Sequence, residues 1–558
     1  MKAPRQAGVR KTAPKNRSAD ISLARKAAFA ILMAIERGHS HSDDLLRGKS
    51  VDALSSPDRN LATALVLGVL RWQIRLDHQI QALLKHPNAK LDPEVLIALR
   101  LGAFQILHMD RIPARAAIDE SVKLAKQAGH RFASSMVNAV LRKLASTPQL
   151  AEAGSALKGH SFSVKGTGSG RAAERTSRDA ALHSAENFGP DSLSCQGRTS
   201  QAPENQIRDS KKCQGTTSVV PQMPQKEAGA LATEGSLPEA SPAELALAHA
   251  HPAWMVERWA TFYGLDAARA LCRHGQTQPV LTLRIQNPAV EDELAAAGIH
   301  LQPGELLTAA RTVISGDATA NAAFSEGRLR LQDEGSQLIA ELASADSVNL
   351  NQNAKSIVDA CAAPGNKTLI LAERNPQARI LACESSPQRF ESLRKRLAPF
   401  GDRIECRRID ATTLSGDATF DLVLADVPCS GTGTLGRNPE IRHRLRPEDL
   451  PRQAERQRAI LLAALRAVRP GGRVVYSTCS LEPEENEQVV VAALAQVPGV
   501  RQLSLESSIQ ALLTQTILTP SGADRLRRSL TSEGALRLLP GVFPTDGFYV
   551  CLLEREPQ

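Results

Sequence analysis

Residues 356–368 read SIVDACAAPGNKT, and this stretch decides the fold. Its first four residues predict a short strand that ends in Asp359, the middle predicts a turn, and residues 369–373 predict the start of a helix. Small residues in the turn let the backbone approach a ligand closely, and the helix N-terminus favours negative charge. A phosphate-binding loop is excluded, because Asn366 and Cys361 stand where that motif requires glycine. The dinucleotide fingerprint G-x-G-x-x-G is also absent.

Three later segments predict further strands, and each ends in a carboxylate. They are residues 378–383 before Glu384, residues 404–409 before Asp410, and residues 420–425 before Asp426. The carboxyl edge of an open α/β sheet is where such folds bind ligands. A carboxylate after the glycine turn can accept hydrogen bonds from a ribose diol, and Glu384 fits this position loosely. One such acid would often be a turn residue, but three in series favour a ligand site.

Two cysteines follow predicted strands. Cys429 ends the segment DVPC after residues 420–425, and Cys479 lies in the segment STCS after residues 473–476. Two thiols at neighbouring strand ends, one beside a carboxylate, suit chemistry on a poor nucleophile such as carbon 5 of a pyrimidine. A thiolate that adds to carbon 6 makes carbon 5 nucleophilic. The alternative is that both are ordinary buried cysteines, since free cysteine is often buried.

These motifs carry a resemblance. Residues 359–368, 426–433 and 476–480 resemble the RNA cytosine-5 methyltransferases that use S-adenosylmethionine, and so do the shorter segments at 332–337, 438–439 and 546–549. The resemblance covers about residues 240 to 556. One departure is Asn366, where the family usually has a second glycine. Asparagine tolerates left-handed backbone angles better than most residues, so we expect the loop to keep its shape.

The resemblance implies a role for each matching residue. Cys479 would be the nucleophile and Cys429 would assist release of the enzyme from the methylated base, with Asp426 and Lys367 also in the catalytic group. Glu384 would hold the ribose of the cofactor, and Asp410 would lie by the adenine. Asp426 would lie between the cofactor and the target base. The methionine part would be cradled by the backbone of Cys361, Ala362, Ala363, Pro364, Gly365, Asn366 and Lys367. From the residues alone, the two thiols cannot be told apart.

The charge pattern suggests an anionic partner. Lys+Arg 68 against Asp+Glu 59 gives a net charge of +9, and the sequence pI is near 9.2. Residues 1–17 hold six basic residues and no acid, so residues 1–19 are predicted to form a disordered basic arm. Arg437, Arg442 and Arg444 follow the first cysteine segment and are predicted to contact RNA phosphates, with a solvated face as the alternative. Aromatic residues make up 3%, which argues against a base-stacking platform.

The chain divides by composition. Residues 20–147 show helical periodicity. Within them, the segments SPDR at 56–59, LGAFQIL at 101–107 and VNAVLR at 137–142 resemble the NusB-like RNA-binding domain. Residues 148–240 lack apolar periodicity and predict a disordered insertion or linker. Residues 241–325 predict a small α+β connector, and residues 326–556 predict an α/β Rossmann-like domain, which the resemblance above implies is the S-adenosylmethionine methyltransferase domain. The helical segments and strands expected in the first and third of these parts are 23–35, 59–72, 76–84, 93–108, 114–128, 133–144 and 281–285.

This domain order resembles that of the bacterial RsmB (Sun/Fmu) type of enzyme. It implies methyl transfer from S-adenosylmethionine to carbon 5 of a cytosine in small-subunit (16S) ribosomal RNA. A tRNA cytosine-C5 methyltransferase and a non-catalytic RNA-binding or antitermination factor are the alternatives. No apolar run reaches the length of a membrane span, and no zinc-ligand spacing occurs. Catalytic thiols suit a reducing cytoplasm, and we expect a monomer without a bound metal.

Overall fold

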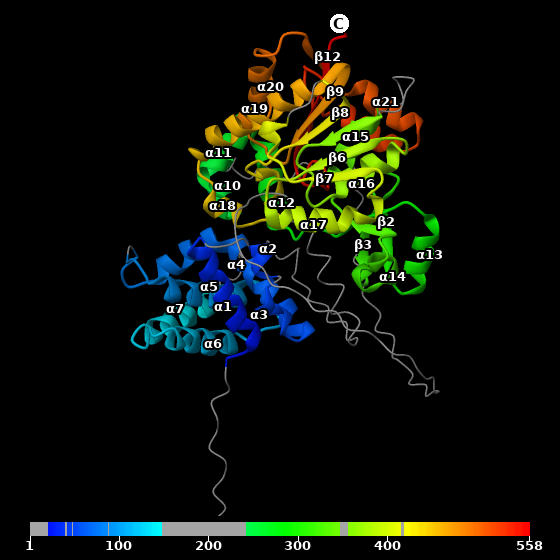
Figure 1. Ribbon diagram of the computed structural model, residues 1–558. Coiled ribbons are helices and arrows are strands. Elements are labelled where there is room, and N and C mark those ends of the chain that lie inside the picture. The colour runs from blue at the N-terminus through cyan, green and yellow to red at the C-terminus, as the bar shows by residue number, and fades with distance from the viewer. Residues whose placement is uncertain are drawn as a thin grey trace, which may run out of the picture.

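The computed structural model describes residues 21–38, 42–46, 48–87, 89–147, 241–345, 355–414 and 418–557 (Figure 1). The predicted basic arm (1–19) and the predicted insertion (148–240) lie outside these residues. Among the described residues, no helix is long and apolar enough to cross a membrane. The same residues contain no group of three or more His, Cys, Asp or Glu side chains that could hold a metal ion.

The helical domain lies at the lower left in Figure 1, below the large sheet. Ser22 and Ser55 cap its first and fourth helices by accepting from the backbone N–H groups of Arg25 and Asp58. One long helix replaces the two predicted over residues 59–84, because nothing between Trp72 and Leu76 breaks it. The helices are α1 (Leu23–Glu36), α2 (Ser42–Leu46), α3 (Lys49–Asp52), α4 (Ser56–Leu83), α5 (Pro93–His108), α6 (Ala114–Gln127) and α7 (Ser134–Ser146).

The connector combines five helices with a small antiparallel sheet in the order β2-β3-β1-β4. Its last strand lies beyond residue 325, so this sheet extends past the predicted boundary. Its elements are α10 (Pro242–Ala248), α11 (Ala253–Tyr263), α12 (Leu265–Gln276), β1 (Thr282–Ile285), α13 (Pro288–Ala296), β2 (His300–Pro303), β3 (Ala310–Ser315), α14 (Ala322–Ser325) and β4 (Leu329–Leu331).

The C-terminal domain is built on a mixed sheet with the order β10-β12-β9-β8-β5-β6-β7, and β11 pairs with β12. Five of these strands run parallel, while β12 is antiparallel to β9. The α/β Rossmann-like fold predicted for this domain is therefore confirmed. The strands are β5 (Ser356–Asp359), β6 (Arg379–Cys383), β7 (Ile404–Arg407), β8 (Phe420–Asp426), β9 (Val468–Thr478), β10 (Val500–Leu503), β11 (Leu536–Leu538) and β12 (Phe548–Arg555).

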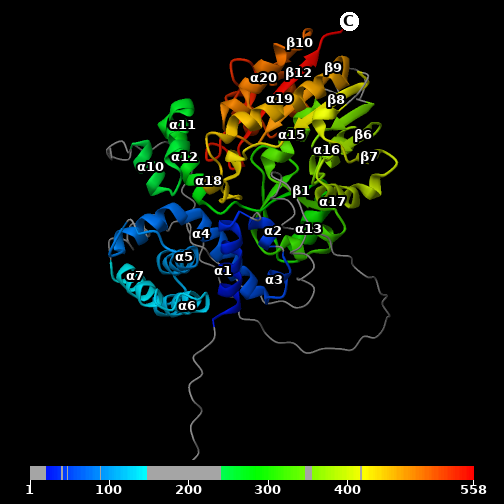
Figure 2. The ribbon, with the colours of Figure 1, turned by 60° about the vertical axis from the view of Figure 1, so that its left-hand side comes forward.

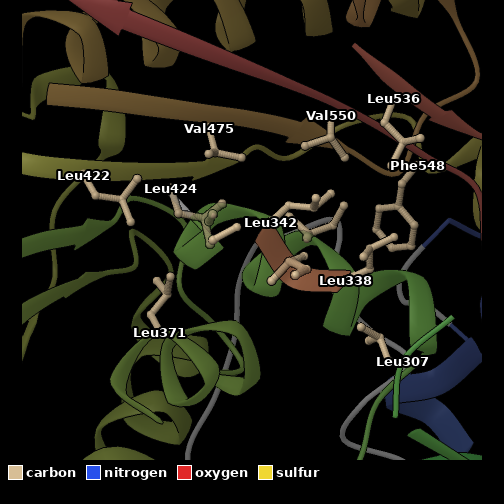
Figure 3. Packing of buried hydrophobic residues seen from close by; sticks show 14 of the residues in the cluster. Leu307, Leu338, Leu342, Leu371, Leu422, Leu424, Val475, Leu536, Phe548 and Val550 are labelled. Atoms are coloured by element: carbon tan, nitrogen blue, oxygen red, sulfur yellow. The ribbon is translucent and has the colours of Figure 1, made fainter. Parts of the chain in front are cut away.

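Helices cover both faces of this sheet (Figure 2). On one face, Leu338 and Leu342 pack into a core that contains Leu424 and Val475 of the sheet (Figure 3). The other face buries a second core that includes Leu461 and Tyr476. The helices are α15 (Glu334–Ala345), α16 (Asn366–Arg374), α17 (Pro387–Leu397), α18 (Ile441–Arg444), α19 (Asp449–Ala467), α20 (Glu487–Leu494), α21 (Glu506–Thr514) and α22 (Pro520–Arg527).

Candidate active site

The two cysteines meet at the carboxyl edge of the sheet. Strands β8 and β9 are parallel neighbours, with Asp426 opposite Ser477, so both strands deliver their following loops to one place. The Sγ atoms of Cys429 and Cys479 lie 3.3 Å apart. Cys429 is 0% exposed and Cys479 is 6% exposed. The predicted juxtaposition of the two thiols is therefore present in the structure.

A third loop closes against the two cysteine loops. The N–H of Gly433 donates to the carbonyl of Cys479 at 2.9 Å, and the N–H of Gly547 donates to the carbonyl of Gly433 at 2.8 Å. A Cβ atom at position 433 would lie 2.5 Å from the Gly547 oxygen and 2.8 Å from the Cys479 oxygen. Only glycine fits this close approach. The segment at 546–549 thus belongs to the site.

Asp426 joins the cysteine loops to the glycine turn. Its Oδ1 accepts from the Ser477 hydroxyl at 2.5 Å, and its Oδ2 lies 2.9 Å from the Nζ of Lys367. Lys367 is 5% exposed, and its ammonium group also lies 5.9 Å from the ring centroid of Phe548. The lysine and Ser477 therefore fix the position of the carboxylate beside Cys429.

The glycine turn connects β5 to α16. Gly365 takes φ of +102°, and a Cβ there would lie 3.1 Å from Leu393 Cδ1. Asn366 instead starts α16, where its side chain donates to the Leu331 carbonyl at 3.3 Å and accepts from Arg396 at 2.8 Å. The expectation that Asn366 is tolerated because asparagine accepts left-handed backbone angles was therefore wrong. The left-handed position is Gly365, and Asn366 is held by side-chain hydrogen bonds.

Four carboxylates, rather than three, line this edge of the sheet. Glu384 is 6% exposed and accepts from the N–H of Ser386 at 2.8 Å. The Asp410 side chain is 45% exposed and caps the turn that follows β7. The fourth is Asp359 at the end of β5, which accepts from the Thr368 hydroxyl at 2.7 Å. Burial raises the pKa of Asp359 to about 7, although the Thr368 hydrogen bond opposes the shift.

The residues present fit the cofactor expected from the sequence. Asp359 Oδ1 is buried and has no hydrogen-bond partner among the described residues, and such an orphan acceptor usually signals a missing donor. The ammonium group of an amino-acid moiety is a donor of that kind. Glu384 follows β6 at the same edge of the sheet and is buried, and Asp410 has a side chain that solvent or a ligand can reach.

The arginines predicted to contact RNA have a different role. Arg437 lies between two carboxylates, 2.7 Å from Asp546 and 3.1 Å from Asp333. Burial alone would lower the pKa of Arg437, but these two acids outweigh burial and raise it. Arg442 is 2% exposed and donates to four backbone carbonyls, those of Arg71, Ala250, Gly275 and Leu435.

The prediction of phosphate contacts for Arg437 and Arg442 is therefore corrected, because Arg442 is buried against protein carbonyls and Arg437 is paired with two protein carboxylates. Arg444 is partly buried at the end of α18, and its contact with RNA stays a prediction. Arg437 has a consequence for the site, since it joins the three segments at 332–337, 437–439 and 546–549.

Comparison with known families settles the family question. Residues 347–554 match the family described as 16S rRNA methyltransferase RsmB/F, residues 22–146 match the NusB family, and residues 251–313 match the ferredoxin-like domain of RsmF/B-like methyltransferases. The C-terminal domain is thus that of the RsmB/F family of 16S rRNA methyltransferases, and the helical domain is that of the NusB family. These matches confirm the resemblance drawn from the motifs, the NusB-like domain and the assignment as a methyltransferase.

Relatives of this protein match over nearly the whole chain. The probable ribosomal RNA small subunit methyltransferase B of Bacillus subtilis is 29% identical, over 95% of this chain and 98% of that protein. Ribosomal RNA small subunit methyltransferase B of Pseudomonas putida is 28% identical, over 95% of this chain and 98% of that protein. A solved structure, "Crystal Structure of PH0851", shares the fold with a TM-score of 0.60 and 20% identity, over 96% of this chain and 99% of that one.

Sequence reasoning missed two kinds of residue at this RsmB/F site. Asp359 was predicted to end a strand but was not predicted to be a fourth acid of the site, although its position at the end of β5 was a sufficient signal. Asp333 and Asp546 lie within the quoted motifs, yet nothing in the sequence paired them with Arg437. Their separations along the chain, 104 and 109 residues, carry no local pattern.

Proposed function

We propose that this chain transfers a methyl group to carbon 5 of a cytosine in small-subunit (16S) ribosomal RNA, through a covalent bond between Cys479 and carbon 6 of the base. The observation that carries the proposal is the pair of thiols 3.3 Å apart beside the Asp426–Lys367 ion pair. S-adenosylmethionine would supply the electrophilic methyl group. The proposed location is the cytoplasm, and the proposed form is a monomer.

The cofactor is assigned to the glycine turn and the carboxylates around it. The backbone from Cys361 to Lys367 would hold its methionine part, with Asp359 facing the amino group. Glu384 would hold the ribose and Asp410 the adenine. Replacing Glu384 by Ala should weaken cofactor binding by about 1–3 kcal/mol, the usual cost of leaving buried polar groups unpaired. Isothermal calorimetry on the cofactor measures this change, and unchanged affinity would contradict the ribose assignment.

The two thiols differ in their surroundings. Burial raises the pKa of the Cys429 thiol well above its ordinary value, and the hydrogen bond with Cys479 raises it further. Cys429 therefore keeps its proton and donates to the sulfur of Cys479. A donor beside Cys479 stabilises that sulfur as a thiolate before the attack on carbon 6.

Release of the product uses the same contact. After methyl transfer, carbon 5 gives up its proton to a base, the carbon 6–sulfur bond breaks, and the sulfur of Cys479 takes the bonding pair. The S–H of Cys429 stands beside the departing sulfur. Asp426, which is held by Lys367 and Ser477, would lie beside the cytosine ring. These roles agree with Cys479 as nucleophile and Cys429 as the residue that assists release.

A denaturing gel with labelled RNA tests the proposal. Cys479→Ala should abolish methylation and form no protein–RNA adduct, since the attacking thiolate is missing. Cys429→Ala should still attack but release slowly, so that an adduct survives denaturation. Cys551→Ala removes a buried cysteine on β12 and serves as a control that should behave like the wild type. An adduct in Cys479→Ala would overturn the assignment.

A further inference from the structure

A further buried carboxylate, that of Glu485, binds both cysteine loops. Glu485 is 0% exposed and ends a short 3-10 turn after the Cys479 loop. It accepts from the N–H of Ser430 at 2.8 Å, from the Ser480 hydroxyl at 2.5 Å, from the Gln457 amide at 2.8 Å, and from the Ser430 hydroxyl. Four donors from three segments therefore converge on one side chain.

The two serines follow the two cysteines directly. Ser430 comes after Cys429, and Ser480 comes after Cys479. The Gln457 amide that reaches Glu485 also donates to the Pro428 carbonyl at 2.9 Å, so the Cys429 loop is held on both sides of the thiol. The two serine hydroxyls lie 3.0 Å from each other. No other described carboxylate bonds to the residues that follow both cysteines.

We propose that Glu485 is a positioning residue that sets the separation of the two thiols, and through it the rates of both attack and release. The inference rests on the proposed function, because it takes the roles of Cys479 and Cys429 from it. Glu485 itself touches neither thiol. It acts through the backbone on which each thiol is carried, and a displacement near 1 Å of a reacting group is enough to slow a reaction strongly.

The pattern of donors fits an ionised Glu485. An ionised carboxylate is acceptor-only and has about four lone-pair sites, which matches four donors. Burial raises the pKa of Glu485, while the hydrogen bonds from Ser430, Ser480 and Gln457 oppose that rise. Glutamine can replace it with little distortion. Its oxygen can accept from the fixed N–H donors of Ser430 and Gln457, and its amide can donate to the hydroxyls, which can rotate.

The chain offers a matched control in the same loop. Glu482 is also 0% exposed, and burial raises its pKa too. Its carboxylate binds Arg258 at 2.8 Å and Trp259 at 3.2 Å, both on α11, and not the residues that follow the cysteines. Replacing Glu482 by Gln or Ala tests the loss of a buried carboxylate from this loop without releasing either cysteine loop.

Single-turnover kinetics with labelled RNA test the proposal. Adduct formation and adduct decay are followed separately by quenching into denaturant. Glu485→Ala should slow both steps, each by about 100-fold, which is the effect of a misplacement near 1 Å. The KM values for RNA and cofactor should stay unchanged. Glu485→Gln should restore most of both rates, and the two Glu482 variants should keep them.

Two variants that each remove one serine hydroxyl separate the effect on adduct formation from the effect on adduct decay. Ser480→Ala should slow adduct formation more than decay, because it frees the Cys479 loop. Ser430→Ala should slow decay more than formation, because it frees the Cys429 loop. Normal rates in Glu485→Ala would overturn the proposal, as would equal effects of the two serine variants on both steps. If Glu485→Ala does not fold, the serine variants decide alone. A wild type that forms no adduct would refute the proposed function instead.

Discussion

The catalytic domain meets its two neighbours through buried arginines, but the two contacts are built differently. Against the connector, Arg284 of β1 is met by carboxylates of α15 and α16. Against the helical domain, Arg442 of α18 is met by the backbone carbonyl of Arg71, and its other hydrogen bonds go to carbonyls of the connector and of its own domain. A guanidinium group that faces carboxylates keeps its charge balanced, whereas one that faces carbonyls has only partial negative charges around it.

The connector contact is an ion network. Arg284 lies 2.8 Å from Glu341 and 3.0 Å from Glu373, and its side chain is 1% exposed. Arg374 binds Glu341 at 2.6 Å, and Arg330 binds Glu373 at 2.5 Å. Three guanidinium groups therefore share two carboxylates. Because Glu373 and Arg374 end the helix that begins at the glycine turn, this network attaches the small sheet to the cofactor side of the catalytic domain.

The contact with the helical domain has no comparable ion network around Arg442. The described residues show no salt bridge to this arginine. Burial lowers the pKa of Arg442 to about 9. His443 approaches the Leu70 carbonyl of α4 with its Nε2 at 2.6 Å, and burial lowers its pKa to about 3. Arg71 of α4 donates to the Gly436 carbonyl at 2.8 Å. The helical domain thus docks on the segment that follows Cys429, through groups that would prefer water.

The two contacts should therefore respond to different perturbations. The ion network against the connector should be disrupted when one charged side chain is removed, because the removal leaves the partners of that side chain unpaired. The contact with the helical domain should fail when its hydrogen-bond geometry is lost or when its neutral histidines become charged. Three changes test this contrast.

The largest effect is expected from the ion network. Arg284→Ala leaves Glu341 and Glu373 buried with fewer partners and should lower the free energy of unfolding by about 3–5 kcal/mol. Chemical denaturation of the whole chain, followed by tryptophan fluorescence and circular dichroism, measures the loss. Arg328→Ala is the control, since Arg328 makes exposed ion pairs with Glu293 and Glu326 and should have little effect. Equal losses in the two variants would contradict the contrast.

The contrast also shows what the sequence could predict. The turn at 359–368 and the cysteine segments are local patterns, and their strands were placed within a few residues. Arg437 and Arg442 were misjudged because a basic cluster beside a ligand site has the same sequence pattern whether it faces phosphate, carboxylate or carbonyl. Their partners come from segments far away along the chain. Glu485 was missed for the same reason, since Ser430 lies 55 residues before it.

A smaller effect is expected at Arg442. Arg442→Met keeps much of the apolar stem but leaves four carbonyls without their donor, while it also removes a poorly solvated charge. These two effects oppose each other, and together they should weaken the free energy of docking of the helical domain by about 1–3 kcal/mol. Small-angle X-ray scattering should show a larger radius of gyration. Arg446→Met, an exposed arginine two residues beyond α18, should leave it unchanged. A compact Arg442→Met variant would mean that α18 is not what holds the two domains together.

The smallest effect concerns pH. The pKa of His443 is lowered to about 3 by burial, with Arg442, Arg100 and Arg444 adding to the shift and the Leu70 carbonyl opposing it. The pKa of the neighbouring His249 is lowered to about 4 by burial and by Arg273, Arg75 and Arg269. A histidine with a lowered pKa binds its proton more readily once the contact opens. Stability is therefore present above pH 6.5 and is lost as the pH falls from 6.5 towards 4. At pH 6, His443 alone should favour opening by about 1 kcal/mol.

His443→Gln isolates this contribution, because glutamine can donate to the Leu70 carbonyl but does not titrate. Scattering measured between pH 7.5 and pH 5.5 should show the wild type expanding as the pH falls, and the Gln variant expanding less. Arg284 and its carboxylates provide the internal comparison, since this network contains no histidine and should hold the connector in place over the same range. Hydrogen exchange of α16 should then stay constant, after correction for the intrinsic effect of pH, while exchange of α4 around Leu70 increases. The same dependence in both helices would show that acid loosens the whole fold, and the distinction between the two contacts would be lost.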